Sequence, residues 1–132
     1  DDLLTGTLTT LAGTLPGHAV AIATADDADD VRIPDRLVRG RMPIETATLL
    51  AALALDAGEP VQRPEGDGAV LAFPLIGSRG PMGALVASTS RAAFADADRA
   101  MLQVTARQLA LTLENLRLRR SLDRLLFRTE DG

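Results

Sequence analysis

The chain has 132 residues, a formal net charge of −4 and no cysteine. This length suits a single domain that buries about two-thirds of its unfolded surface. The missing cysteines exclude disulfides, thiolate metal sites, thiol nucleophiles and thioether-linked chromophores. Only three aromatic residues are present and the overall charge is acidic, so we expect no nucleic-acid partner. No apolar run reaches membrane-spanning length, so we expect no membrane contact and a cytoplasmic location.

The first third of the chain predicts a helix followed by a strand. Leucines recur at helical spacing over residues 2–15, and Pro16 and Gly17 end that helix. Residues 19–25 alternate branched side chains with alanines, which indicates a strand. The acidic run over residues 26–30 is interpreted as a solvated turn rather than a cation site, because it lacks EF-hand spacing. A short strand at residues 31–33 follows.

The middle of the chain predicts an irregular segment, one helix and a pair of strands. Residues 34–45 show no clean period, with one helical turn expected around 35–39. Residues 46–57 form an amphipathic helix that Gly58 ends. An extended piece begins near residue 59, and residues 63–68 are expected to form a polar turn. Two apolar runs, 69–76 and 82–88, predict a β-hairpin with a loop over 77–81. The fold class is therefore α+β, an antiparallel sheet covered by helices.

The last third of the chain predicts one long helix, residues 96–127, that carries two apolar stripes. Asp96 is expected to cap it. One stripe follows a single helical face and ends at residue 116; its members are Leu102, Ala106, Leu109, Leu113 and Leu116. The other is a heptad repeat of Met101, Val104, Gln108, Leu111, Asn115, Leu118, Leu122 and Leu125. The two stripes lie roughly 150° apart around the helix. We expect the first to pack on the domain and the second to meet a second copy of the chain.

Two polar residues interrupt the heptad repeat. Gln108 and Asn115 occupy one heptad position, where a polar side chain costs stability but fixes the register and number of strands in a coiled coil. The alternative is that both face solvent beside a shallow seam. The arginines at the end of this helix are interpreted as charges that flank a coiled coil, not as a nucleic-acid surface.

The second half of the chain resembles a GAF domain, roughly over residues 61–122. The resemblance lies in residues 71–75, Gly80, residues 83–86, Phe94, Asp96, Asp98, Leu102, residues 108–110 and residues 114–118. It implies a GAF-like central antiparallel sheet, with the first and last helices on one face and an irregular roof over the other. In ligand-binding members of the family, a small molecule lies beneath that roof. Here the roof would be residues 32–57 and the floor the strands 69–76 and 82–88.

This resemblance, together with the side-chain chemistry, selects the candidate ligand-binding residues. Three arginines in the expected roof could bind a carboxylate or phosphate group through bidentate hydrogen bonds. The candidates are Arg36, Arg39, Arg41, Thr46, Phe73 and Ser88. The alternatives are that the arginines are solvated loop charges and that Phe73 belongs to the core. His18, the only histidine, is interpreted as a surface or helix-end residue rather than a haem ligand or general base. No catalytic residues, metal site or cofactor are expected.

These observations predict a non-catalytic sensory or regulatory domain of a bacterial signalling protein. The domain would span residues 1–127, with residues 128–132 as a tail or linker to an output domain in the same parent chain. We expect a homodimer through the terminal helices that relays the signal of a small-molecule ligand or a partner. The alternative is a purely structural dimerisation module without a ligand.

Overall fold

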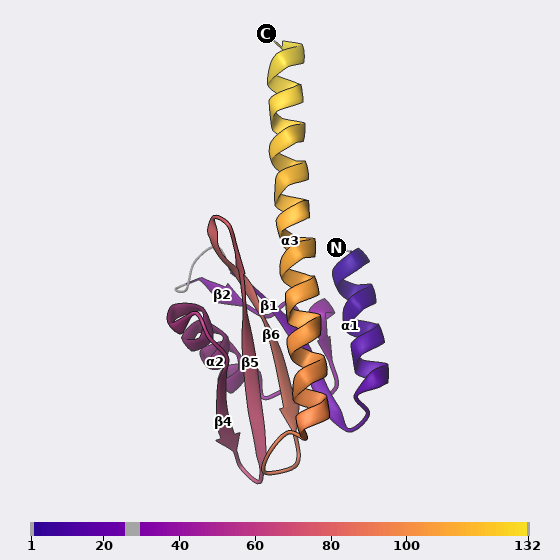
Figure 1. Ribbon diagram of the computed structural model, residues 1–132, viewed down its shortest axis with the longest axis vertical. Coiled ribbons are helices and arrows are strands. Elements are labelled where there is room, and N and C mark those ends of the chain that lie inside the picture. The colour runs from indigo at the N-terminus through magenta and orange to yellow at the C-terminus, as the bar shows by residue number, and fades with distance from the viewer. Residues whose placement is uncertain (1, 26–29, 132) are drawn as a thin grey trace.

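One antiparallel sheet separates two helical layers in the computed structural model, which describes residues 2–25 and 30–131 (Figure 1). The elements in chain order are α1 (Asp2–Thr14), β1 (His18–Ala25), β2 (Val31–Arg32), the 3-10 helix η1 (Asp35–Leu37), β3 (Val38–Arg39), α2 (Ile44–Ala57), β4 (Val61–Glu65), β5 (Gly68–Gly77), β6 (Gly80–Thr89) and α3 (Asp96–Asp131). Helices α1 and α3 cover one face of the sheet, and α2 covers the other. This arrangement confirms the predicted α+β architecture.

The sheet is built around the two long strands β5 and β6. The strand order is β2-β1-β6-β5-β4, with β3 also paired to β1. Leu85 of β6 lies opposite Ile22 of β1 and Phe73 of β5 in this register. Since successive side chains of a strand point to opposite faces, the register sorts the apolar residues into two separate clusters.

The cluster on the α1 and α3 side is made of large side chains. Leucines of both helices pack on Ile22, Leu71, Phe73 and Leu85 of the sheet. The cluster on the α2 side is made mostly of small ones, with Leu50 of α2 packed among alanines and valines. The small side chains allow α2 to lie close to the sheet.

Several boundaries differ from the sequence prediction because strand pairing continues further into the turns. The segment predicted as a polar turn, residues 63–68, is divided between β4 and β5, leaving only Gly66 and Asp67 between them. The loop predicted over residues 77–81 shrinks to Ser78 and Arg79. Gly66 and Gly80 have positive φ angles of 60° and 116°, which glycine adopts at little cost and which permit these tight turns.

Helix α3 is the longest element and extends well past the sheet (Figure 1). Its first intrahelical hydrogen bond joins the N–H of Arg99 to the carbonyl of Ala95. Asp96 is therefore the first helical residue, not the cap that the sequence predicts. The helix also continues through residues 128–131, the segment expected as a tail. Over residues 2–25 and 30–131, no helix is long and apolar enough to cross a membrane.

Candidate functional site

The first apolar stripe of α3 packs on the domain. Leu102 and Leu109 are 0% and 1% exposed, and Ala106 is 6% exposed. Leu113 is partly buried against the same cluster. The prediction that this stripe faces the sheet is confirmed.

The second stripe of α3, here called the seam, is exposed along its whole length. The apolar members range from 38% exposed at Met101 to 67% at Leu111, and the projecting part carries Leu118, Leu122 and Leu125. Gln108 and Asn115, its polar members, are exposed as well. A row of exposed leucines and related residues on one helix face is unusual for a protein surface.

A groove borders the seam where α1 runs beside α3. The groove has a volume of about 830 Å³. Helix α1 contributes Leu3, Gly6 and Thr10, and α3 contributes Met101 and Val104. Leu3 is 57% exposed, so α1 adds its own apolar residue to the seam. Small residues on α1 leave room for another helix to approach closely.

The three candidate arginines lie in different places. Arg36 lines a cavity on the α1 and α3 side of the sheet. Arg39 donates hydrogen bonds to the carbonyls of Arg36 and Val38 at 2.8 and 2.9 Å and to Thr9 Oγ1 at 3.3 Å. It therefore fastens η1 and β3 to α1. Of the three arginines, only Arg41 lies beside a candidate ligand-binding residue of the sheet, which is Ser88.

Two further candidates do not join Arg41 and Ser88. Thr46 on α2 donates a hydrogen bond to Glu65 Oε2 of β4 at 2.9 Å. Phe73 belongs to the cluster on the α1 and α3 side, because odd-numbered residues of β5 face that way. The prediction of Phe73 as a floor residue beneath the α2 roof is wrong, and the core alternative holds.

The cavity that brings Arg41 and Ser88 together lies between the start of β1 and the β4–β5 turn. Its volume is about 570 Å³. Glu65 and Asp67 also line it, so two acidic side chains accompany one arginine. Ser88 is only 9% exposed. This cavity carries charged side chains of both signs on a largely apolar lining and is open to solvent.

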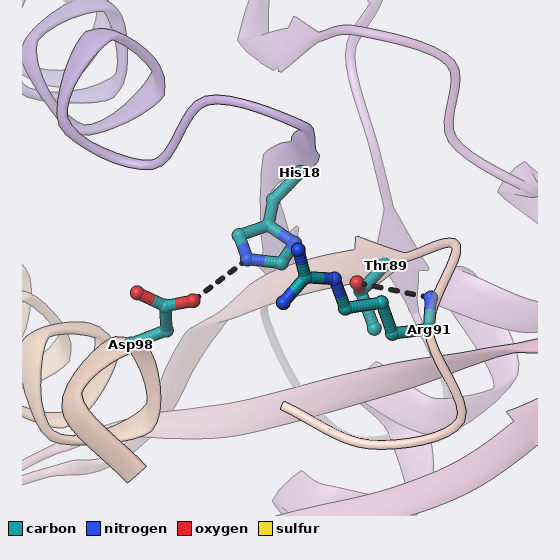
Figure 2. A network of polar contacts seen from close by, with 4 residues as sticks. All are labelled: His18, Thr89, Arg91 and Asp98. Atoms are coloured by element: carbon teal, nitrogen blue, oxygen red, sulfur yellow. Dashed lines mark hydrogen bonds and ion pairs between the residues drawn. The ribbon is translucent and has the colours of Figure 1, made fainter. Parts of the chain in front are cut away.

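A side-chain hydrogen bond that the sequence does not predict joins the sheet to α3. His18 Nε2 lies 2.9 Å from Asp98 Oδ2, and the His18 side chain is 9% exposed (Figure 2). The imidazole also lies against Phe94, with ring centroids 5.4 Å apart. His18 is thus partly buried between β1 and α3, not a freely exposed surface residue. The two partners are 80 positions apart, so no local pattern could reveal the pair.

A second attachment holds α3 near its middle. Glu114 accepts hydrogen bonds from the backbone N–H and the hydroxyl of Ser78 in the β5–β6 turn. These bonds, above all the one from the Ser78 hydroxyl, lower the pKa of the Glu114 carboxyl, and Arg117 and Arg79 add to the effect. Arg117 in turn donates to the carbonyl of Pro81 at 3.3 Å.

The family model and the solved structures that match this chain indicate the same fold. A family model for the GAF domain matches residues 1–115. No curated protein sequence matches the chain. Among solved structures, the GAF domain of a phosphoenolpyruvate-protein phosphotransferase from Coxiella burnetii is 20% identical, with a TM-score of 0.70 over 91% of this chain and 85% of its own.

Two further solved structures differ in what their proteins do. The GAF domain of a two-component sensor histidine kinase from Bacillus halodurans is 16% identical, with a TM-score of 0.67 over 89% of this chain and 95% of its own. A type II free methionine-R-sulfoxide reductase from Thermoplasma acidophilum is also 16% identical, with a TM-score of 0.67 over 86% and 92%. At these identities the likeness concerns the fold.

Proposed function

We propose that this chain, which belongs to the GAF domain family, is a non-catalytic regulatory domain that forms a parallel homodimer through α1 and α3. The dimer would pass a signal along α3 to an output domain in the same parent chain. The observation that carries the proposal is the exposed seam on a helix whose opposite stripe is buried.

The exposed seam supports a dimer on energetic grounds. Burying a leucine side chain stabilises an assembly by about 1.5–3 kcal/mol. Leu111 is 67% exposed, while Leu122 and Leu125 are each 58% exposed. Leu122 and Leu125 follow the attachment at Glu114 and belong to the part of α3 that projects past the sheet, where no other described element runs beside the helix. A second α3 would cover the whole row.

A second copy of this chain is the occupant that best fits the seam. The heptad spacing is the one by which two helices pair over a long distance. Asn115 lies in the repeat at a position where asparagine favours parallel two-stranded pairing, because two such side chains can hydrogen-bond across the interface. The groove between α1 and α3 is continuous with the seam through Met101 and Val104. Helix α1 would therefore extend the same interface.

Sedimentation of seam variants tests the dimer. The double variant Leu118→Glu/Leu122→Glu places two carboxylates per chain in the seam, and we expect it to sediment as a monomer while the unmodified protein sediments as a dimer. The matched control is Gln103→Glu/Arg124→Gln, which changes the charge of α3 by the same amount at exposed positions away from the seam and should remain a dimer. An unchanged sedimenting mass for the seam variant would contradict the proposal.

The two attachments of α3 support the relay. Asp98 joins the first turn of α3 to β1, and Glu114 joins its middle to the β5–β6 turn. A ligand or partner that shifts the sheet would move the helix at both points. Such coupling requires that the signal bind two helix arrangements with different affinities.

A structural dimerisation module without a ligand is the second candidate. It is favoured by the close packing of α2 on the sheet, where Leu50, Ala51 and Ala54 are each 0% exposed. Those side chains occupy the place beneath the predicted roof. Native mass spectrometry of gently purified protein separates the two candidates, since a co-purified small molecule favours the regulatory domain and its absence favours the module.

The proposal of a non-catalytic domain rests on the side-chain inventory. The sulfoxide reductase with the same fold is an enzyme, but this chain has no cysteine to act as a nucleophile. Its single histidine is held by Asp98 in a buried position. We expect no reduction of free methionine sulfoxide by the purified chain in the presence of a dithiol reductant.

A further inference from the structure

The cavity beside Arg41 and Ser88, here called the end cavity, lies outside the layer that α2 fills. It is bordered by the start of β1, the segment 40–43 before α2, the β4–β5 turn and the ends of β5 and β6 that adjoin it. No residue of α2, which is described along its whole length, lines it, and neither do Ala25 and Asp30, which flank the gap in the described chain. Its volume of about 570 Å³ falls in the range of roughly 300–1,000 Å³ that is typical of small-ligand sites.

Two glycines bring backbone into the walls of the end cavity. Gly40 has a φ of 89°, and a Cβ atom at this position would lie 3.1 Å from Cβ of Ala19, so the segment before α2 runs directly against β1. A Cβ atom at Gly68 would collide with the carbonyl oxygen of Thr89, so β5 and β6 approach closely where the sheet ends. Both glycines line the end cavity. These parts of its walls therefore cannot be closed by a change of side-chain rotamer.

The charged side chains that line the end cavity do not neutralise one another. Arg41 and Asp67 come from separate segments, and neither forms a hydrogen bond or an ion pair within residues 2–25 and 30–131. Glu65 accepts a hydrogen bond from Thr46 through Oε2 alone. Opposite charges that border one cavity without pairing can each take a partner from a molecule placed between them.

The start of α2 adds donors on the side of Arg41. The first intrahelical bond joins the N–H of Ala47 to the carbonyl of Pro43 at 2.8 Å, so the N–H groups of residues 44–46 have no acceptor within the helix. Pro43 lines the end cavity together with Arg41, and a helix N-terminus attracts anions. Ser88 lines it too, is only 9% exposed, and its hydroxyl bonds to no described residue. This buried hydroxyl is therefore available to a ligand.

We propose that the end cavity binds a small zwitterion with a free ammonium, a free carboxylate and an apolar body, the chemistry that a free amino acid and a dipeptide share. Arg41 would bind the carboxylate through bidentate hydrogen bonds, and Asp67 would accept hydrogen bonds from the ammonium. Ala19, Ala69 and Val70 give the cavity an apolar surface for the remainder of the ligand. Such a ligand would be the signal of the proposed regulatory domain, and the inference rests on that function.

The end cavity adjoins the place where the sheet holds the first turn of α3. Gly17, His18 and Ala19 line the cavity at the start of β1. His18 Nε2 lies 2.9 Å from Asp98 Oδ2 of α3. A ligand in the end cavity would therefore bind beside the strand residue to which α3 is attached, and this position suits the proposed relay.

Equilibrium dialysis with radiolabelled L-leucine and, separately, with radiolabelled L-leucyl-L-leucine tests the site. We expect saturable binding of at least one of these probes, and the tighter of the two identifies a free amino acid or a short peptide as the ligand. The N-acetyl derivative of the bound probe lacks the ammonium, and its C-terminal amide lacks the carboxylate. Added unlabelled, each derivative should compete roughly tenfold or more weakly than the unlabelled probe, because each has lost a charge-assisted contact.

Two charge-neutralising variants assign the two ends of the ligand. Arg41→Gln should weaken binding of the probe roughly tenfold or more but leave the affinity of its amide unchanged, and Asp67→Asn should do the same for the probe and its N-acetyl derivative. The matched controls Arg107→Gln and Asp56→Asn make the same charge changes at exposed positions outside the cavity and should retain full affinity. Far-ultraviolet circular dichroism establishes that all variants are folded.

The remaining outcomes each overturn the proposal. Absence of saturable binding of both probes would mean that the end cavity is not a site for such zwitterions. Equal affinity for the probe and its two derivatives would show that only an apolar body is bound, and equal weakening by the controls would assign the loss to net charge. Sedimentation of the same samples keeps the dimer separate, because a dimer that binds neither probe contradicts this inference alone, and a monomer that binds one contradicts the proposed dimer alone.

Discussion

Ser78 and Glu114 join the tip of the β5–β6 hairpin to the middle of α3. The backbone N–H of Ser78 lies 3.0 and 3.2 Å from the two carboxylate oxygens of Glu114, and its hydroxyl donates to the same group. The two residues are 36 positions apart in the chain. Together with the Arg117 guanidinium, which donates to the Pro81 carbonyl, this contact holds α3 at the tip of the hairpin.

Removing the charge of Glu114 should destabilise the domain in a pH-dependent manner. The pKa of this carboxyl is lowered from its ordinary value of 4.5, so its ionised form favours the folded state. Its contribution is full above the unfolded pKa and is lost as the pH falls through the lowered folded pKa. Urea unfolding should therefore show Glu114→Gln less stable than the unmodified protein at pH 7, with the difference shrinking below about pH 4.5. A difference that is independent of pH would contradict the assignment.

Loss of Asp98 should cost more stability than loss of its exposed neighbour. Asp98→Ala leaves the buried His18 ring without the partner of its Nε2 atom, and we expect a loss of about 1–3 kcal/mol in the free energy of unfolding. Asp96→Ala, in the same helical turn, removes only a favourable charge near the helix N-terminus, worth about 0.3–1 kcal/mol. Chemical denaturation of the two variants side by side measures this, and equal losses would argue against the ion pair.

The close packing beneath α2 predicts a sharp contrast between two adjacent leucines. Leu50 is 0% exposed and Leu49 is 53% exposed. Leu50→Ala should lower the free energy of unfolding by about 2–5 kcal/mol, because it leaves a cavity in a filled layer. Leu49→Ala should change it by less than about 0.5 kcal/mol. Thermal or urea unfolding of the two variants measures both losses. A small loss of unfolding free energy for Leu50→Ala would mean that the layer under α2 is loosely packed.

Replacing Asn115 should alter the assembly if the seam pairs two chains. Asn115→Leu removes the polar residue that restricts the interface to one register. We expect a more stable assembly with additional oligomeric states, resolved by size-exclusion chromatography with light scattering. Gln103→Leu, at an exposed position of α3 away from the seam, serves as the control and should leave the assembly unchanged. An unchanged, monodisperse mass for Asn115→Leu would place this residue outside the interface.

The regular helices and strands were predictable from the sequence, because apolar residues that recur at a regular spacing share one face of the element and that face is buried. Leu4, Leu8 and Leu11 of α1 lie in the core as expected, and so does the stripe of Leu102, Ala106 and Leu109 on α3. The turns were predicted too long, because the pairing of neighbouring strands, as at Gly77 and Gly80, recruits polar turn residues into the sheet.

The candidate site was harder to predict because its parts come together only in three dimensions. Sequence reasoning grouped Arg36, Arg39 and Arg41 by their proximity along the chain, yet the structure sends them to different surroundings. Phe73 was assigned to the wrong face, since an apolar run fixes that a strand is buried but not which residues face which helix. The partnership of His18 with Asp98 depends on contacts between distant segments and left no local pattern.

Helix α3 contains 36 residues and spans about 54 Å. Neither glycine nor proline interrupts it, so the residues that most often break or kink a helix are missing from its length. Each residue added to or removed from the projecting part would turn anything joined to that end by about 100°. In the proposed dimer, the number of residues in α3 would therefore set the angle at which domains joined to the two helices face each other.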